Sequence, residues 1–534
     1  MGSQSAPRAT PDLAHTVRCT AVLTLGLLCC TLLWGAERRT VTLLFTNDLE
    51  SAYDPTDAFW RSDMARIGGI GQLATLIKQE RAAAEIAFLL DAGDIFTGSL
   101  SRRSHGAVAF DLMQLLDYDA MAIGNHEFEY GWKRFAEEKA RAPFPVLGAN
   151  LFYRGTDHPY AQPWTIIERG GVRLGVIGLL GTDAATALIP SNIAGVEVRD
   201  PVATLAHLVA RLRAEVDLIV VLAHQGPTAP MQTDDEADPR VFRGNSENFA
   251  LAGAVPGVDV ILAGHTDAGT PEALVHPQTG TLIMQTWGQG QHLGRLVLDM
   301  DARGNITAHR SALLPVNADV LHPAQEVEAR LAEWRSKYPE LREIIGHLDG
   351  GATRRYYDEA PLGNLFADIV ARAADARIGL MPSGALRRDL PAGAVRREEL
   401  LDAFPFEDRI ARVTLTGATL RALLERGFAL ERGLLQLSGL RVWYAPDRPA
   451  GERIEQICVG TEALSDERLY VIGTIEIIAA GGDAFVEARE ALDVDMLEVR
   501  FAASLEAAFQ SEASLRAPEL GRVSSAAPPA TCTL

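Results

Sequence analysis

The chain has few cysteines and fewer basic than acidic residues, and each shortage argues against certain classes of function. Three of its five cysteines lie within the first 30 residues, which leaves only Cys458 and Cys532 in the body of the chain. Two cysteines permit one disulfide without implying it, and they argue against a cysteine-based metal site or nucleophile. The 70 acidic and 50 basic residues give a formal net charge of −20, which repels nucleic acid and anionic lipid.

The chain also lacks an apolar run long enough for an ordinary transmembrane helix. Two arginines precede a short apolar run at residues 21–36, and a charged cluster ends it. This pattern predicts a secretory signal peptide over residues 1–36, and therefore export to the periplasm or cell envelope. Two alternatives remain open, an uncleaved signal anchor and lipid attachment at Cys29 or Cys30, although Leu28 stands where a small residue is usual. Contact with a membrane is expected only in those two cases.

The remaining residues are enough for two domains with full cores. From residue 41, short apolar runs alternate with helical patterns, which predicts a layered α/β domain with parallel strands over residues 38–318. A charged helical stretch predicts a linker helix over residues 319–345. A second, smaller α/β domain is expected over residues 346–510, and a disordered tail rich in Ala, Ser and Pro over residues 511–534.

Polar clusters follow five of the apolar strands of the first domain, each at the carboxyl end of its strand. The clusters are Asp48 with Glu50, Asp94, Asn125 with His126, His224, and His265 with Asp267. Strand ends at one edge of a sheet can converge on one point, and ligands bind there in open α/β sheets. The pooled set is rich in oxygen and contains imidazoles, so it predicts a site for two divalent metals.

Several of these clusters stand in motifs that resemble the metallophosphoesterases. The most specific is Gly124-Asn125-His126-Glu127, and Gly93-Asp94, His224-Gln225-Gly226 and Gly264-His265 support it. The second half adds Leu362-Gly363-Asn364, Ser383-Gly384-Ala385-Leu386-Arg387, Pro405-Phe406, Ser438-Gly439 and Gly481-Gly482-Asp483. With both halves together, the chain resembles the secreted 5′-nucleotidase / UDP-sugar hydrolase family over nearly all of residues 41–509.

This resemblance implies an α/β/β/α metallophosphoesterase domain followed by a smaller α/β substrate-binding domain. It also implies a secreted phosphohydrolase that uses two divalent metal ions to release phosphate from nucleotides or related phosphoesters. We expect Mn²⁺ to be favoured, with Zn²⁺, Mg²⁺ and Ca²⁺ as alternatives. Two other readings remain open: a phosphoesterase for a non-nucleotide substrate, and a non-catalytic secreted metal-binding protein on the same scaffold.

The resemblance also implies a role for each matched residue. Asp94 would bridge the metals; Asn125, His224 and His265 would complete one site, and Asp48, Glu50 and Asp267 the other. His126 would stabilise the leaving oxygen or the transferring phosphoryl group, and Glu129 would orient it. Substrate contacts would come from Arg387, Arg355 (or Arg354 in its place), Leu434, Ile477 and Asp483.

The chain departs from the family pattern at two kinds of position. Glu50 and Asp267 replace neutral metal ligands, which predicts one metal site built from carboxylates alone. Leu434 and Ile477 occupy the positions assigned to the two aromatic rings that sandwich the base, and Pro382 replaces an asparagine. These changes favour the non-catalytic reading. His126 argues against it, because metal binding alone does not require this residue.

Overall fold

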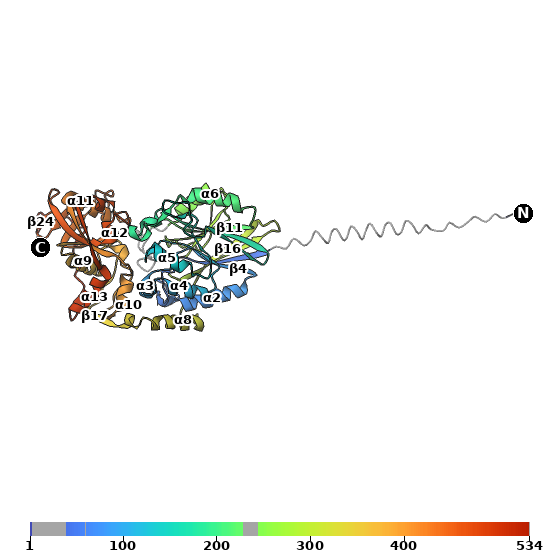
Figure 1. Ribbon diagram of the computed structural model, residues 1–534, viewed down its shortest axis with the longest axis horizontal. Helices are drawn as coiled ribbons and strands as arrows, with labels where there is room; N and C mark the ends of the chain where they lie inside the picture. The colour runs from blue at the N-terminus through green and yellow to red at the C-terminus, as the bar shows by residue number, and fades with distance from the viewer. Residues whose placement is uncertain (3–38, 59, 228–243, 533–534) are drawn as a thin grey trace.

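The computed structural model describes residues 1–2, 39–58, 60–227 and 244–532. The signal peptide predicted over residues 1–36 therefore lies almost wholly outside the described residues. Within the described residues, no helix is long and apolar enough to cross a membrane. Figure 1 shows two lobes side by side, the first half of the chain forming one and the last third the other.

Two six-stranded sheets form the centre of the first domain. The first sheet has the order β16 (Ile306–Pro315), β15 (His292–Met300), β1 (Arg39–Thr46), β4 (Ile86–Asp91), β5 (Ala120–Ala122) and β6 (Val146–Leu147). The second has the order β13 (Leu274–Val275), β14 (Leu282–Gln285), β12 (Val260–Gly264), β11 (Leu218–His224), β9 (Val172–Leu180) and β8 (Trp164–Arg169).

The alternation of side chains along these strands produces the layers, because successive residues of a strand point to opposite faces. On β1, Leu43 and Phe45 pack in one apolar cluster with Val220 of β11, so the two sheets meet face to face. Leu44 points the other way and packs in a cluster with Leu73 and Leu112. These two residues belong to α2 (Ile70–Ala83) and α4 (Ala107–Leu115).

The outer face of the second sheet is covered in the same way. Ile219 and Val221 of β11 pack in a cluster with Leu208 and Leu251. These come from α6 (Pro201–Leu212) and α7 (Ser246–Ala254). The α/β/β/α layering is thus confirmed, and it refines one expectation. The five polar clusters follow strands of two sheets, since β1, β4 and β5 belong to the first and β11 and β12 to the second.

A helix and an extended stretch connect the domains. α8 (Gln325–Ser336) packs through Val327 and Leu331 against the first domain, so the predicted linker helix has a buried face as well as a solvated one. It contacts α4 and α2, and Figure 1 shows it along the lower edge of the molecule. The first strand of the second domain, β17, begins at Ile344.

The second domain is built on a five-stranded sheet. Its order is β21 (Leu435–Ser438), β18 (Ile378–Pro382), β25 (Leu469–Ile475), β20 (Arg409–Thr416) and β26 (Asp493–Arg500). Its helices are α9 (Pro361–Ala373), α10 (Arg397–Ala403), α11 (Gly417–Phe428), α12 (Glu476–Ala479) and α13 (Phe501–Ser511). Figure 1 shows α12 on the side of this domain that faces the first one.

The prediction of a disordered tail is wrong for residues 511–532. Two short strands of the tail, β27 (Leu515–Arg516) and β28 (Val523–Ser524), pair with β17 (Ile344–Asp349) and β22 (Leu440–Tyr444). Arg522 forms an ion pair with Asp368 at 2.8 Å, and a disulfide joins Cys532 to Cys458. The tail is poor in large apolar residues, but it is ordered because its backbone extends sheets that the domain has already formed.

Candidate active site

Five of the predicted metal ligands stand on strained backbone just beyond strand ends. Asp48, Glu50, Asp94, His265 and Asp267 all have positive φ, between 43° and 80°. The left-handed region is unfavourable for residues other than glycine, by an order of about 1–3 kcal/mol each, and such strain gathers at functional sites. The fold thus holds these side chains in place at the expense of local backbone energy.

Three of the ligands already form a compact group. The candidate ligand atoms of Asp94, His224 and His265 all lie within 4.8 Å of one another, and all three side chains are buried. Nδ1 of His224 lies 2.9 Å from the carbonyl oxygen of Ala92, to which it can donate. That hydrogen bond turns Nε2 toward Asp94, 2.9 Å from its Oδ2, which is the ring nitrogen that a metal-binding imidazole would present to the ion.

The remaining predicted ligand of this group also reaches it. Oδ1 of Asn125 lies 3.1 Å from Nε2 of His224. A carboxylate, an amide oxygen and two imidazoles are a donor set that suits a divalent transition metal. Burial raises the pKa of Asp94, but the nearby His224 and His126 outweigh burial, so its pKa falls below the usual range. The carboxylate is therefore charged and able to hold a cation.

The three other predicted ligands line the same cavity without forming a second compact group. Among the described residues, only Asp94, His224 and His265 form a group of three or more such atoms within 4.8 Å. Oδ2 of Asp48 accepts the backbone N–H of His265 at 2.9 Å. Oε1 of Glu50 lies 3.4 Å from Nε2 of His126 and therefore points toward the predicted catalytic histidine. Asp267 also lines the cavity.

His126 is oriented by the residue predicted to do so. Its Nδ1 lies 2.5 Å from Oε1 of Glu129, and Thr97 donates to the same oxygen at 3.1 Å. Burial lowers the pKa of His126, but the carboxylates of Asp94 and Glu129 outweigh this and raise it to about 9. Glutamate in place of aspartate does not prevent the pairing, because the 3₁₀ turn His126–Phe128 brings the longer side chain back to the ring.

The sequence did not point to Glu127 as a structural element of this site. Its carboxylate is fully buried and accepts the backbone N–H groups of Gly124 at 2.6 Å, Ile95 at 2.8 Å and Asp94 at 3.0 Å. These donors belong to two loops that carry predicted metal ligands. Glu127 therefore links the Asp94 loop to the Asn125 loop through hydrogen bonds. The motif alone did not indicate this structural role.

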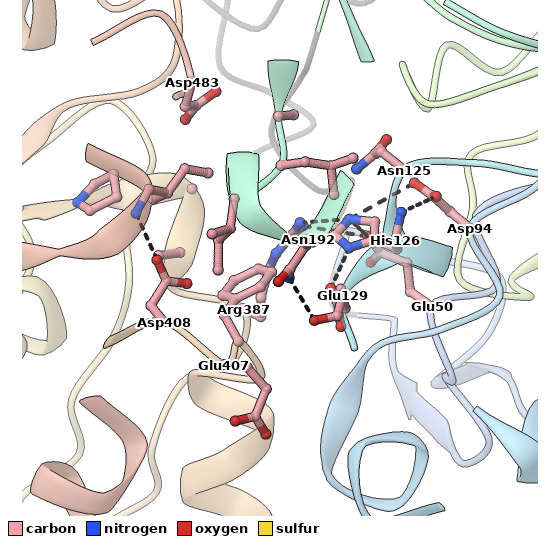
Figure 2. Close-up of a pocket in the computed structure, with 18 of the residues that line it drawn as sticks. Glu50, Asp94, Asn125, His126, Glu129, Asn192, Arg387, Glu407, Asp408 and Asp483 are labelled. Atoms are coloured by element: carbon pink, nitrogen blue, oxygen red, sulfur yellow. Dashed lines mark hydrogen bonds and ion pairs between the residues drawn. The ribbon is translucent and has the colours of Figure 1, made fainter. Parts of the chain in front are cut away.

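Arg387, predicted to contact substrate, extends from the second domain to two predicted site residues of the first. Its Nη2 lies 3.2 Å from Nε2 of His126, and its Nη1 lies 3.5 Å from Oε1 of Glu50. Figure 2 shows Arg387 pointing across the domain boundary toward His126 and Glu50. The second domain thus places a guanidinium beside the group expected to act on the phosphoryl oxygen.

A cavity extends from these residues into the second domain. Ile477 and Asp483 line it, as predicted, and Pro382 lines it as well. Arg355 and Leu434 are not among the lining residues: Arg355 is exposed, and Leu434 is buried in the core of the second domain. Arg354 donates its backbone N–H to Asp389 at 2.8 Å and does not line the cavity either.

Two aromatic residues to which the sequence assigned no role, Phe406 and Tyr356, line the cavity, whereas Leu434 does not. The ring of Phe406 is stacked with that of His126, with centroids 6.2 Å apart and planes 24° apart. The guanidinium carbon of Arg387 lies 5.4 Å from the centroid of Phe406. The Pro405-Phe406 motif was the available signal, but its part in the cavity depends on how the loop folds back to the first domain.

Comparison with known proteins assigns both halves. Residues 41–268 match the family model of calcineurin-like phosphoesterases, and residues 344–489 match that of the 5′-nucleotidase C-terminal domain. The chain is 28% identical to a 5′-nucleotidase of Bos taurus over 515 residues, covering 85% of each protein. It is 26% identical to a 5′-nucleotidase of Vibrio cholerae over 504 residues, covering 85% of this chain and 87% of that one.

Solved structures give the same result. A 5′-nucleotidase precursor from Thermus thermophilus superposes with a TM-score of 0.78 at 27% identity, covering 91% of this chain and 99% of that one. The same fold occurs in a Thermus thermophilus sulfate thiohydrolase, with a TM-score of 0.72 at 22% identity and coverage of 91% and 96%. Both domains and the metal-ligand cluster point to one assignment: the chain belongs to the 5′-nucleotidase family and is a phosphoester hydrolase with a metallophosphoesterase domain.

Proposed function

We propose that the protein is an exported phosphohydrolase that uses two divalent metal ions to release phosphate from nucleoside monophosphates. The observation that carries this proposal is the contact between Arg387 and His126, 3.2 Å apart across the domain boundary. It joins the metal-ligand cluster to a cavity that both domains line. The phosphoryl group would lie at the metal ligands and the nucleoside in the second domain.

The metal ligands are proposed as two overlapping sets. Asp94, Asn125, His224 and His265 would hold one ion, and Asp48, Glu50 and Asp267 would share Asp94 to hold the other. Ions bound there would activate a water molecule and draw negative charge away from the phosphoryl oxygens. The second set contains only carboxylates, whose oxygens suit Mn²⁺, Mg²⁺ or Ca²⁺, and we favour Mn²⁺.

The side chains around the metal ligands would handle the rest of the reaction. Glu129 fixes the ring of His126 through Nδ1, so Nε2 faces the cavity and can donate a proton to the departing oxygen. The fork of Arg387 can bind two phosphoryl oxygens at once, because guanidinium geometry matches phosphate. Its present contacts with Glu50 and His126 support a position beside the transferred group.

The nucleoside would occupy the part of the cavity farther from the metals. Tyr356 brings an aromatic ring and Ile477 an apolar side chain to the lining, and the ring of Phe406, which stacks on His126, lies at the catalytic side. Asp408 and Asp483 line the same space and could accept hydrogen bonds from sugar hydroxyl groups. Leu434 and Ile477 stand at the two positions that the resemblance assigns to the stacking rings, so we expect weaker discrimination among bases than rings at those positions would give, since stacking on an aromatic side chain is worth ~1–3 kcal/mol per base.

Export is proposed from the predicted signal peptide, and the disulfide supports it. Disulfides persist in oxidising compartments such as the periplasm, and Cys458 and Cys532 are joined. The periplasm or cell envelope is therefore the proposed location, and membrane attachment would require an uncleaved or lipidated N-terminal segment.

A substrate panel tests the proposed function. Purified protein is assayed for phosphate release from nucleoside monophosphates, UDP-sugars and sugar phosphates, with Mn²⁺, Mg²⁺, Zn²⁺ or Ca²⁺ added. The proposal predicts the highest kcat/KM on nucleoside monophosphates. A higher kcat/KM on phosphoesters without a base would overturn the nucleotide assignment.

A further inference from the structure

One wall of the substrate cavity comes from a segment of the metal domain that carries no recognised motif. This wall, residues 183–192, follows β9 and contains the 3₁₀ turn Ala184–Thr186. It supplies Ala187, Leu188, Ile189 and Asn192 to the lining of the cavity. We call it the 183–192 wall. The remaining lining of the deeper cavity, including Phe406 and Ile477, comes from the second domain.

Two large apolar side chains of the 183–192 wall, Leu188 and Ile189, line the cavity, together with the polar Asn192. Leu188 and Ile189 are 5% and 8% exposed. Leu188 belongs to an apolar cluster against which Phe406 and Ile477 pack. A flat apolar group in the cavity would therefore be bounded by side chains from both domains, and exchange of water for these side chains favours its binding.

An ion pair fixes the 183–192 wall to the second domain. Nη2 of Arg432 lies 3.0 and 2.9 Å from the two carboxylate oxygens of Asp183. Nε of the same Arg432 lies 3.6 Å from Oδ1 of Asp483, which lines the cavity. Arg432 thus connects a residue of the wall with a residue proposed to contact substrate.

Hydrogen bonds at both ends add to this attachment. The backbone N–H of Asp483 donates to the carbonyl oxygen of Thr186 at 3.2 Å. Nδ2 of Asn192 donates to the carbonyl oxygen of Glu129 at 2.8 Å, and Glu129 orients His126. The wall is therefore hydrogen-bonded both to Asp483, proposed to contact the nucleoside, and to Glu129, which orients His126.

We propose that the 183–192 wall determines which organic group the enzyme accepts, and that the Asp183–Arg432 pair is a positioning device that holds it. The proposal rests on the phosphohydrolase function above and deepens it. Leu188 and Ile189 act as the metal domain's half of the nucleoside pocket. The pocket has its full apolar boundary only in the domain arrangement that the ion pair stabilises.

Truncation of the wall provides the first test. Leu188→Ala should lower the ratio of kcat/KM for AMP to kcat/KM for glycerol phosphate on the order of 10-fold, the usual scale for lost apolar pocket contacts. Leu208→Ala is the matched control, because Leu208 is equally buried but lies on α6 outside the cavity. The control should leave that ratio unchanged. An equal ratio in Leu188→Ala and wild type would overturn the proposal.

Removal of the ion pair provides the second test. Asp183→Asn should raise KM for AMP several-fold and change kcat little, because it weakens the wall without altering a metal ligand. Salt screens partly exposed ion pairs, so the difference from wild type should shrink in 1 M salt. Asp157→Asn, which removes an exposed partner of Arg199, is the control and should leave KM unchanged. If the Asp183→Asn enzyme has the wild-type KM for AMP at low salt, the positioning role of the Asp183–Arg432 pair is contradicted.

Adenosine binding separates a failure of this proposal from a failure of the proposed function. Adenosine lacks phosphate, so calorimetry measures its affinity without turnover. The proposal predicts that adenosine binds wild type and binds Leu188→Ala on the order of 10-fold more weakly. Loss of hydrolysis with this difference intact would refute only the enzyme function. Equal binding to both proteins, or no binding to wild type, would refute the role of the wall.

Discussion

Nη2 of Arg387 in the second domain lies 3.2 Å from Nε2 of His126 in the metal domain. This contact predicts that the substrate phosphate meets both domains. Arg387→Ala should raise KM for AMP about 10- to 100-fold, since a hydrogen bond to a charged group is worth about 1.5–3 kcal/mol. Arg387→Lys should recover only part of the loss, because an ammonium cannot form the two parallel bonds of a guanidinium. Unchanged KM in the alanine variant would show that the domains do not meet over the phosphate.

His126 should contribute to rate without contributing to metal retention. His126→Ala is expected to lower kcat by about 10²- to 10⁴-fold, the usual range for a general acid or base. Both metals should remain bound, as elemental analysis of the purified variant can show. Glu129→Gln should lower kcat less, since it weakens only the 2.5 Å contact that orients the ring. Full activity of His126→Ala at saturating metal would contradict the assigned role.

Asp408 predicts a pH dependence of stability that does not involve the metal ligands. Burial raises the pKa of its carboxyl to about 7, and Glu476 adds to the rise, while the N–H of Ile477 and the charge of Arg500 oppose it. A folded-state pKa above the unfolded value means that the neutral form is stabilised by folding. This stability is complete at pH below the unfolded value of 3.8 and is lost as pH rises through about 7.

Asp408→Asn keeps the shape of the neutral form and does not titrate. The Tm of the variant should therefore rise relative to the Tm of wild type as the pH increases from 4 to 8. Thermal unfolding at half-unit pH steps measures it. A difference in Tm that stays constant over this range would rule out titration of Asp408.

The disulfide should stabilise the second domain. Cys458 and Cys532 are 74 residues apart, so their bond closes a long loop of the unfolded chain. Replacement of both by serine should lower the free energy of unfolding by about 2–4 kcal/mol, measured by denaturant titration. Kinetic constants should change little, because neither residue lines the substrate cavity. An unchanged unfolding midpoint would mean that the tail strands alone hold this part of the fold.

The strand-end clusters could be predicted from the sequence, because each cluster directly follows an apolar run and parallel strands bring such positions together. The pairing of His126 with Glu129 could be anticipated as well, since the two residues are three apart in one turn. The partition of the clusters between two sheets could not, because strand order depends on packing among distant residues.

The substrate cavity was harder to predict, because it is built between domains. The resemblance implied a substrate contact for Leu434, yet its side chain packs in the core, while Phe406 and Tyr356, which had no assigned role, line the cavity. Leu188 and Arg432 belong to no motif. Leu188 lines the cavity and Arg432 pairs with Asp183 only where the second domain folds against the first. Cys458 and Cys532 gave no spacing signal for their bond, since they are 74 residues apart and meet in a fold whose tail strand at Val523 pairs with β22.

Phosphate release from AMP by metal-free and metal-restored protein tests the central claim most directly. The account predicts no release after metal removal, recovery on addition of Mn²⁺ to a higher rate than with Zn²⁺, and two metal ions per chain at full activity. Asn125→Ala, which removes a proposed ligand oxygen 3.1 Å from Nε2 of His224, should stay inactive with either metal. Phosphate release that persists without metal would contradict a metal-dependent phosphohydrolase centred on these residues. A rate of release by Asn125→Ala equal to that of wild type would contradict it as well.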